Sequence, residues 1–182
     1  MLKVTHMDLQ EVLVLEYGSN TDNRGSSHLL YSRKELEAAG MGTEFAEEIL
    51  YRAAEKGTLY GIHFQNHPRA QTKLLTCTKG QGMDYAIDLR RDSKTYKLWA
   101  STELSAQNGK QMYIPAGFGH AFLSLEDDTH ILMRIDQSFD PALARAISHQ
   151  DAAIGIRLPI PVSVLSDMDR NAPALADSDS NL

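Results

Sequence analysis

The sequence predicts an all-β fold arranged as an antiparallel sandwich or barrel. From about position 59 to 138, short runs rich in aromatic and β-branched residues recur, separated by Gly, Asn, Asp and Pro. This pattern is typical of many short antiparallel strands. With 182 residues, 42% of them hydrophobic, the chain has the size of one domain with a full core. We therefore expect a single domain over residues 1–175, and a polar tail at 176–182 that is disordered.

The expected elements begin with a short strand around EVLVLEY and the polar loop GSNTDNRGSS. A short helix follows, because Ser32 and Glu35 form a capping box. The segment TEFAEEILYRAAEKG has apolar residues at helical spacing, which by itself favours a helix. PALARAISHQD predicts a short helix or turn, and LPIPVSVLSDMDRNAPAL predicts a wrap over the sheet. The strands between these segments are LYGIHFQ, TKLLTCT, GMDYAIDLR, KLWASTEL, QMYIP, HAFLSL and THILMRI.

Composition limits the classes of function. The chain has 18 basic and 24 acidic residues, a net charge of −6, which argues against a general nucleic-acid or membrane binder. Cys77 is the only cysteine, so no internal disulfide can form. The apolar run near the N-terminus is too short for a signal peptide or a membrane span. We expect a soluble, cytoplasmic protein.

Several polar side chains are embedded in the apolar strands. In LYGIHFQ, strict alternation places His63 and Gln65 on one face, which makes Gln65 a candidate substrate contact. Lys73 and His120 are also surrounded by apolar residues, and burying such groups is costly unless they are paired. Each of them alone could be structural. A metal site using His63, His67 and His120 is a weaker alternative, because the spacing does not bring two imidazoles to one ion.

Most of the chain, from about residue 57 to 175, resembles the dTDP-4-dehydrorhamnose 3,5-epimerase family. The resemblance rests on the order, spacing and content of several motifs, which together are far more specific than any one of them. It implies a cupin-type jelly roll that works as a homodimer without a metal or other cofactor. The matching segments are DNRG, GTLYGIHFQ, HPRAQTKLL, DYAIDLRRDSKTY, MYIPAGFGHAF and LSDMDRNAPAL.

The resemblance also implies chemistry and site residues. The substrates of this family are nucleotide-linked 4-keto-6-deoxy sugars, and a positioned base removes an acidic hydrogen beside the ketone to form an enolate. His63 matches the base and Asp169 the residue that orients it, while Lys73 and His120 match positions that face the ketone. Arg24 matches a pyrophosphate-binding arginine, and Phe139 an aromatic residue near the nucleotide base.

This sequence departs from the family pattern at the expected substrate contacts. Met133 and Arg134 stand where the family has its catalytic Tyr and a Lys, and methionine has no proton to donate. Tyr60 stands in place of an arginine, and Glu48 and Leu50 in place of Gln and Asn. The family also forms a strand over EEILYRAAEKG, so the resemblance overrides the helical spacing there.

Together these observations predict an epimerase that inverts C3 or C5, with C3 favoured, of a CDP- or dTDP-linked 4-keto-6-deoxyhexose. The missing tyrosine leaves the second proton to water or to another phenol such as Tyr60 or Tyr113. The expected pathway is deoxysugar synthesis for a surface polysaccharide such as O-antigen, or for a glycosylated metabolite. Two alternatives stay open: a 3,4-ketoisomerase acting through the same enolate, and a nucleotide-sugar binding protein without catalysis.

Overall fold

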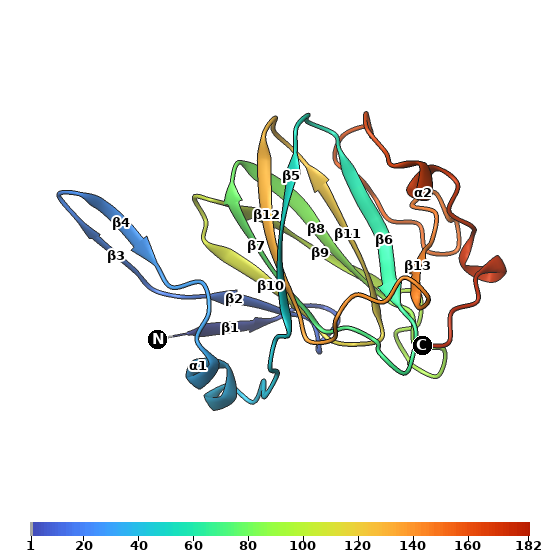
Figure 1. The fold of residues 1–182 in the computed structure, drawn as a ribbon, viewed down its shortest axis with the longest axis horizontal. Coiled ribbons are helices and arrows are strands. Elements are labelled where there is room, and N and C mark those ends of the chain that lie inside the picture. Colours follow the sequence, from blue (N-terminus) through green and yellow to red (C-terminus); the bar gives the residue numbers. More distant parts are fainter. Residues whose placement is uncertain (1) are drawn as a thin grey trace.

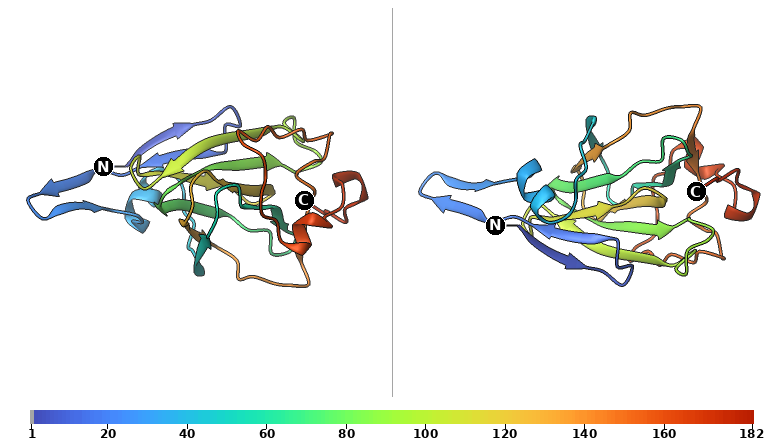
Figure 2. Two further views of the ribbon diagram at one scale, coloured as in Figure 1. Left: turned by 90° about the horizontal axis from the view of Figure 1, so that it is seen from above. Right: turned by 90° about the horizontal axis from the view of Figure 1, so that it is seen from below.

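The computed structural model describes residues 2–182 and consists mainly of two antiparallel sheets that face each other (Figures 1 and 2). None of the helices in these residues is long and apolar enough to cross a lipid bilayer. The six-stranded sheet has the order β1 (Lys3–His6), β2 (Leu13–Glu16), β10 (Lys110–Ile114), β7 (Lys73–Lys79), β12 (Thr129–Ile135), β5 (Glu47–Ala53). The five-stranded sheet has the order β13 (Ala144–Ala146), β6 (Leu59–Gln65), β11 (Phe118–Ser124), β8 (Gln81–Asp88), β9 (Trp99–Ser105). The remaining elements are the hairpin β3 (Ser19–Asp22) and β4 (Gly25–His28), the helices α1 (Arg33–Ala38) and α2 (Asp167–Arg170), and the 3₁₀ turn η1 (Leu175–Asp177).

The main core lies between the two sheets. Leu75 and Met112 of the six-stranded sheet and Phe122 and Leu104 of the five-stranded sheet belong to one buried cluster. Alternate residues of β12 are buried while those between them are more exposed, as expected for a strand with one face toward a core. The all-β, antiparallel fold class that the sequence predicts is confirmed.

Each sheet is also covered on its outer face. The C-terminal segment packs Leu158, Ile160 and other apolar residues against the outside of the five-stranded sheet, where Tyr85 and Ile87 are fully buried. On the six-stranded sheet, Leu36 of α1 joins a separate cluster. Its buried members are Leu13, Leu15, Leu36, Met41, Leu74 and Tyr113. Both sheets therefore bury apolar side chains on two faces.

The elements of the N-terminal third agree with the sequence in part. Ser32 caps α1 by accepting a hydrogen bond from the Glu35 backbone N–H at 3.3 Å, so the predicted start of the helix at Ser32 is confirmed, while the Ser32 N–H donates to the Tyr17 hydroxyl. The segment with helical spacing is the strand β5, paired along its whole length with β12, so the strand that the resemblance implies there is confirmed. The predicted polar loop instead forms the hairpin β3–β4, which projects away from the sandwich (Figure 1).

The C-terminal quarter differs from the prediction at two places. The predicted helix or turn at 141–151 contains β13, a short strand that pairs with β6. The tail at 176–182, expected to be disordered, lies against the loop after β6: the Asn181 backbone N–H donates to Asn66 Oδ1 and Asn181 Oδ1 accepts from the His67 N–H. Ser180 is buried. The physical reason is that residues distant in sequence provide hydrogen-bond partners for the polar groups of the tail. The local composition of the tail does not reveal these partners.

Strict alternation fails within β6. Between His63↔His120 and Tyr60↔Phe122, the pairing of β6 with β11 shifts by one residue. Gly61 lies at the shift with φ of +103°, and a Cβ there would lie 2.3 Å from the His120 carbonyl oxygen, so this close approach requires glycine. The shift places Tyr60 and His63 at one pocket, whereas the sequence groups Tyr60 with Ile62 and Phe64.

Candidate active site

A pocket opens between the two sheets at the level of His63. The five-stranded sheet contributes three polar side chains to it, Tyr60 and His63 from β6 and His120 from β11. The six-stranded sheet contributes Tyr51 from β5, Lys73 and Leu75 from β7, and Ile131 and Met133 from β12. An apolar cavity with a few convergent polar groups is the usual form of a small-molecule site.

His63 is paired with Asp169, 106 positions later in the chain. The His63 Nε2–H donates to Asp169 Oδ1 at 2.5 Å, which leaves Nδ1 as the ring nitrogen that can accept a proton. Asp169 lies in α2, where Ser166 caps the helix and also donates its hydroxyl hydrogen to Asp169 Oδ2 at 2.9 Å. Burial alone would raise the pKa of Asp169, but hydrogen bonds from His63 and Ser166 outweigh it and lower the pKa.

The exposure of this pair suits acid–base chemistry. The Asp169 side chain is only 2% exposed, whereas the His63 side chain is 29% exposed. A buried carboxylate that holds a partly exposed imidazole fixes the ring and stabilises the imidazolium that forms when the ring gains a proton. The pair can therefore act as an oriented general base toward a molecule in the pocket.

A second ionisable cluster lies directly beside His63. His120 pairs with His63 across the β6–β11 ladder, and its Nε2–H donates to Asp84 Oδ1 at 2.6 Å. Lys73 donates from Nζ to the His63 carbonyl oxygen at 3.2 Å. Burial lowers the pKa of Lys73 to about 8, opposed by the charge of Asp84. Burial also raises the pKa of Asp84 and lowers that of His120. These groups form a buried polar cluster that can stabilise negative charge.

Five of the predicted substrate contacts do not line this pocket, and Gln65, Glu48 and Arg134 are three of them. Gln65 is buried, and its side chain is engaged with the protein: Nε2 donates to the Arg69 and Ser138 carbonyl oxygens, and Oε1 accepts from the Asp140 N–H. Glu48 and Arg134 form a 2.6 Å ion pair. This ion pair lies on the outward face of the six-stranded sheet, because on β12 it is Ile131, Met133 and Ile135 that face the core.

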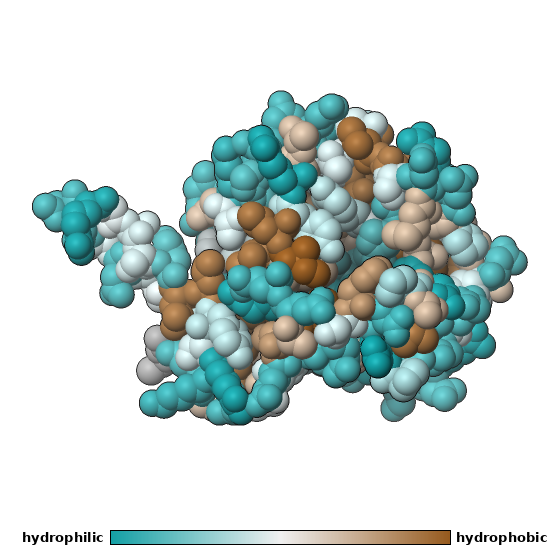
Figure 3. All heavy atoms as spheres, viewed as in Figure 1, coloured by the Kyte–Doolittle hydropathy of each residue, from teal (hydrophilic) through white to brown (hydrophobic). Residues whose placement is uncertain are grey.

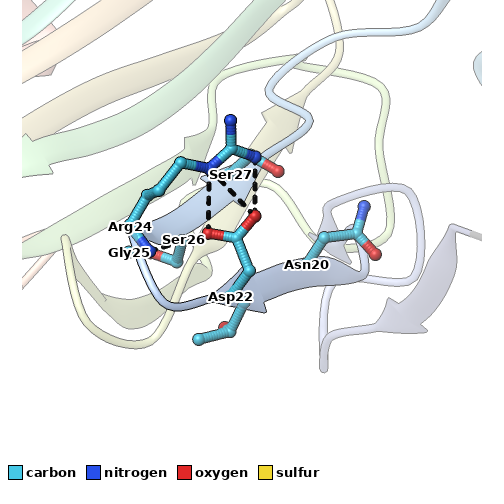
Figure 4. Close-up of a pocket in the computed structure, with 7 residues that line it drawn as sticks. Asn20, Asp22, Arg24, Gly25, Ser26 and Ser27 are labelled. Carbon is cyan, nitrogen blue, oxygen red and sulfur yellow. Dashed lines mark hydrogen bonds and ion pairs between the residues drawn. The ribbon is translucent and has the colours of Figure 1, made fainter.

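Phe139 and Arg24 are exposed and lie apart from the pocket. Phe139 is 60% exposed in the loop after β12. Arg24 lies at the tip of the projecting hairpin, where its side chain is 84% exposed and its Nη2 contacts Asp22 Oδ2 at 2.6 Å (Figure 4). The hollow beside Arg24 is lined only by residues of the hairpin region. In a single chain, Arg24 therefore does not share a site with His63.

Met133 and Tyr60, two of the predicted substrate contacts, line the pocket together with Tyr51. Sequence reasoning did not name Tyr51, although the resemblance already implied a strand over this segment. Once this segment is treated as a strand, alternation places Ile49 and Tyr51 on the inward face, where both pack on the core. Tyr113, suggested as a proton donor, packs in the cluster outside the six-stranded sheet and its hydroxyl contacts Thr43.

Metal-binding side chains do not gather at this pocket. Within residues 2–182, no group of three or more His, Cys, Asp or Glu side chains is arranged to hold a metal ion. His67, considered with His63 and His120 for such a site, is exposed in the loop after β6.

The chain is similar to characterised proteins over nearly its whole length. Residues 6–177 match the family model described as dTDP-4-dehydrorhamnose 3,5-epimerase. A dTDP-4-dehydrorhamnose 3,5-epimerase from Shigella flexneri is 33% identical over 179 residues, which cover 98% of each chain. The crystal structure of dTDP-4-dehydrorhamnose 3,5-epimerase from Bacillus anthracis with TDP and PPi bound superposes with a TM-score of 0.93 and 34% identity, covering 96% of this chain and 99% of that one.

A third similarity is to the crystal structure of a 3′-monoepimerase from Streptomyces bikiniensis in complex with dTDP-quinovose. It has a TM-score of 0.87 and 30% identity, and covers 94% of this chain and 87% of that one. These similarities confirm both the resemblance and the cupin-type sandwich that it implies.

Proposed function

Because this chain belongs to the dTDP-4-dehydrorhamnose 3,5-epimerase family, we propose that it epimerises a nucleotide-linked 4-keto-6-deoxyhexose with His63 as the base. Its relatives place it among the isomerases. The observation that supports the assignment of the base is the 2.5 Å contact between His63 and the buried Asp169 at the mouth of an apolar pocket.

The reaction follows from the groups around this pair. Nδ1 of His63 removes the hydrogen from the carbon beside the ketone, and the electron pair of the C–H bond moves into an enolate. Asp169 stabilises the resulting imidazolium, and Lys73 with His120 stabilises the enolate oxygen. A proton then reaches the same carbon from the opposite face, and His63 gives up its own proton to solvent. The net change is inversion of one carbon.

We favour inversion at C3 alone. Met133, whose thioether cannot donate a proton, lines the pocket on the sheet that faces His63, so proton delivery on that side is restricted. The similar proteins include both a 3,5-epimerase and a 3′-monoepimerase, so one scaffold supports both outcomes. For the nucleotide we propose dTDP, for which the relatives are named, with CDP as the alternative. The product would enter deoxysugar synthesis for a polysaccharide such as O-antigen, or for a glycosylated metabolite.

The test is hydrogen exchange. The protein is incubated in D2O with dTDP- or CDP-4-keto-6-deoxyglucose, and deuterium at C3 and C5 is followed by NMR. We expect deuterium at C3 with an inverted product for one nucleotide. Labelling at both carbons would establish a double epimerase. A 3-keto product would indicate a ketoisomerase, and binding without exchange would indicate a binding protein; either result contradicts the proposal.

Lys73 gives a prediction about pH. Burial lowers the pKa of Lys73 to about 8, so the ammonium that stabilises the enolate is present below this pH and is lost above it. We expect kcat/KM to fall about tenfold per unit as the pH rises above about 8. The Lys73→Met variant should have kcat/KM lower by about 10²- to 10³-fold and should lack this alkaline decline. A wild-type profile that stays flat to about pH 10, where a free lysine loses its proton, would contradict the role of Lys73.

We further propose that the protein is a homodimer in which the hairpin β3–β4 reaches the site of a second copy. All residues of both hairpin strands are exposed, and the hairpin projects from the body as a hydrophilic arm (Figure 3). An isolated hairpin is at best marginally stable in water, so a receiving surface would order it. Leu50 of β5 is 58% exposed, which adds an apolar contact for a second copy. If Arg24 binds pyrophosphate, it does so in the pocket of the other chain.

Mixing two inactive variants tests this arrangement. Arg24→Ala and His63→Ala are each expected to be nearly inactive alone. In a mixed dimer, the chain with His63 receives Arg24 from the other chain and forms one working site. Unfolding and refolding an equimolar mixture should therefore restore about a quarter of the wild-type activity, since half of the dimers are mixed and each has one working site. No recovery, although mixed dimers form, would mean that Arg24 does not act across the interface.

A further inference from the structure

Inversion needs a proton donor on the side of the substrate opposite to His63, and the thioether of Met133 has no proton to give. Building on the proposed function, we propose that Tyr51 is the catalytic residue that donates this proton. Tyr51 is on β5 in the six-stranded sheet, whereas His63 is on β6 in the five-stranded sheet, and both line the same pocket. A sugar held between the sheets would have the base on one side and the phenol on the other.

The other pocket residues of the six-stranded sheet do not fill this role. Leu75, Ile131 and Met133 have no proton to give. Lys73 can donate, but its Nζ is directed to the His63 carbonyl oxygen at 3.2 Å and interacts with the charge of Asp84. It therefore lies with the base and the enolate-stabilising cluster. Tyr51 is the one remaining donor on this side of the pocket among the described residues.

The strand register places Tyr51 next to Met133. Tyr51 pairs with Ile131, and Ile49 pairs with Met133, across the β5–β12 ladder. Tyr51 and Met133 are thus diagonal neighbours on one face, a separation of about 7 Å that aromatic side chains span. The Tyr51 phenol on β5 therefore lies beside Met133 of β12, on the side of the pocket where Met133 cannot donate a proton.

Tyr60 holds the ring of Tyr51 rather than donating the proton itself. The Tyr60 hydroxyl donates to the Arg52 carbonyl oxygen at 3.1 Å, and Tyr60 lies on the same strand as the base. The two rings meet edge to face, with centroids 5.4 Å apart and planes at 60°. For the Tyr51 hydroxyl, the described residues provide no hydrogen-bond partner, so it is available to a substrate. Burial, helped by Tyr60, raises the pKa of Tyr51, so the phenol keeps its proton at neutral pH.

The proton transfers balance. The O–H bond of Tyr51 breaks as the new C–H bond forms, and the enolate electrons return to the carbonyl carbon–oxygen double bond. The Tyr51 phenolate then takes a proton from water, and the His63 imidazolium gives its proton to water. The enzyme returns to its starting state without any other reactant.

The Tyr51→Phe variant separates removal of the hydrogen from its delivery. It keeps the ring and its packing against Tyr60, and it lacks only the hydroxyl. In D2O with the substrate that the wild type inverts, we expect inverted product to form at least about 100-fold more slowly. Exchange of the substrate hydrogen for deuterium with retention should continue within a fewfold of the wild-type exchange rate, because His63 is unchanged. Tyr113→Phe is the matched control, since its phenol lies outside the pocket, and it should invert normally.

The results distinguish this inference from the proposed function. If the wild type neither exchanges nor inverts, the proposed function fails. If the wild type inverts and Tyr51→Phe inverts at a similar rate, only the role of Tyr51 fails. Loss of exchange together with inversion in a folded Tyr51→Phe protein would make Tyr51 a binding residue and overturn the proposal. Loss of inversion in Tyr60→Phe but not in Tyr51→Phe would identify Tyr60 as the donor instead, with the same consequence.

Discussion

Replacing His63 by alanine is expected to abolish turnover and deuterium exchange together. The base alone accounts for about a 10²- to 10⁴-fold rate increase, and among the described residues His63 is the one imidazole that is hydrogen-bonded to Asp169. Both C–H cleavage and inversion need this step, so neither can continue when it is lost. The measurement is the rate of deuterium incorporation, with thermal unfolding and circular dichroism to establish that the variant is folded.

His67→Ala is the matched control for this substitution. His67 is only four positions away but is exposed in the loop after β6, so its removal should leave the exchange rate within about twofold, as for a surface substitution of small effect. A His63→Ala protein that exchanged at a near-normal rate would overturn the assignment of the base, and with it the mechanism.

Replacing Asp84 by alanine is expected to have the largest effect on stability. The Asp84 side chain has no exposed surface, and it accepts the hydrogen bond of the buried His120 at 2.6 Å. Removing Asp84 leaves the buried His120 Nε2–H without its acceptor, and an unsatisfied buried polar group typically costs about 1 to 3 kcal/mol. We therefore expect the free energy of unfolding to fall by about this amount, measured by urea denaturation.

The same substitution should move the pH dependence of activity. The charge of Asp84 raises the pKa of Lys73 against the effect of burial, so its removal lowers that pKa further. The alkaline decline in kcat/KM should then begin at lower pH than in the wild type. Asp92→Ala is the control, because Asp92 is an exposed aspartate in the turn after β8 and should change stability by less than about 0.5 kcal/mol. A loss of less than about 1 kcal/mol in Asp84→Ala would show that this pair does not support the fold as argued.

Much of the fold was determined by local sequence pattern. The seven strand predictions between 59 and 138 coincide with β6 to β12, because alternation and Gly, Asn, Asp and Pro turns act over a few residues. The helix cap at Ser32 is equally local. The same pattern also marked His63, Lys73 and His120 as polar residues in apolar strands, and these three meet at one pocket. Their common location follows from strand order, since β6 and β11 are neighbours and β7 lies in the opposite sheet.

Other features needed contacts between distant segments. The spacing of apolar residues in β5 fits a helix, and pairing with β12 along seven residues makes it a strand, which brings Tyr51 into the pocket. The register shift at Gly61 turns Tyr60 toward His63. Asp169 is 106 positions from its partner, and the sequence indicated it only through the resemblance to a family.

The sequence by itself therefore determined the strands, the family and three polar residues of the pocket, His63, Lys73 and His120. The tertiary structure decided which side chains share the pocket, which lie on the outer faces as Glu48 and Arg134 do, and which project on a hairpin as Arg24 does. The physical reason is the range of the forces involved. Side-chain alternation is set by neighbouring backbone geometry, whereas register, sheet order and ion pairing depend on segments that meet only after the chain has folded.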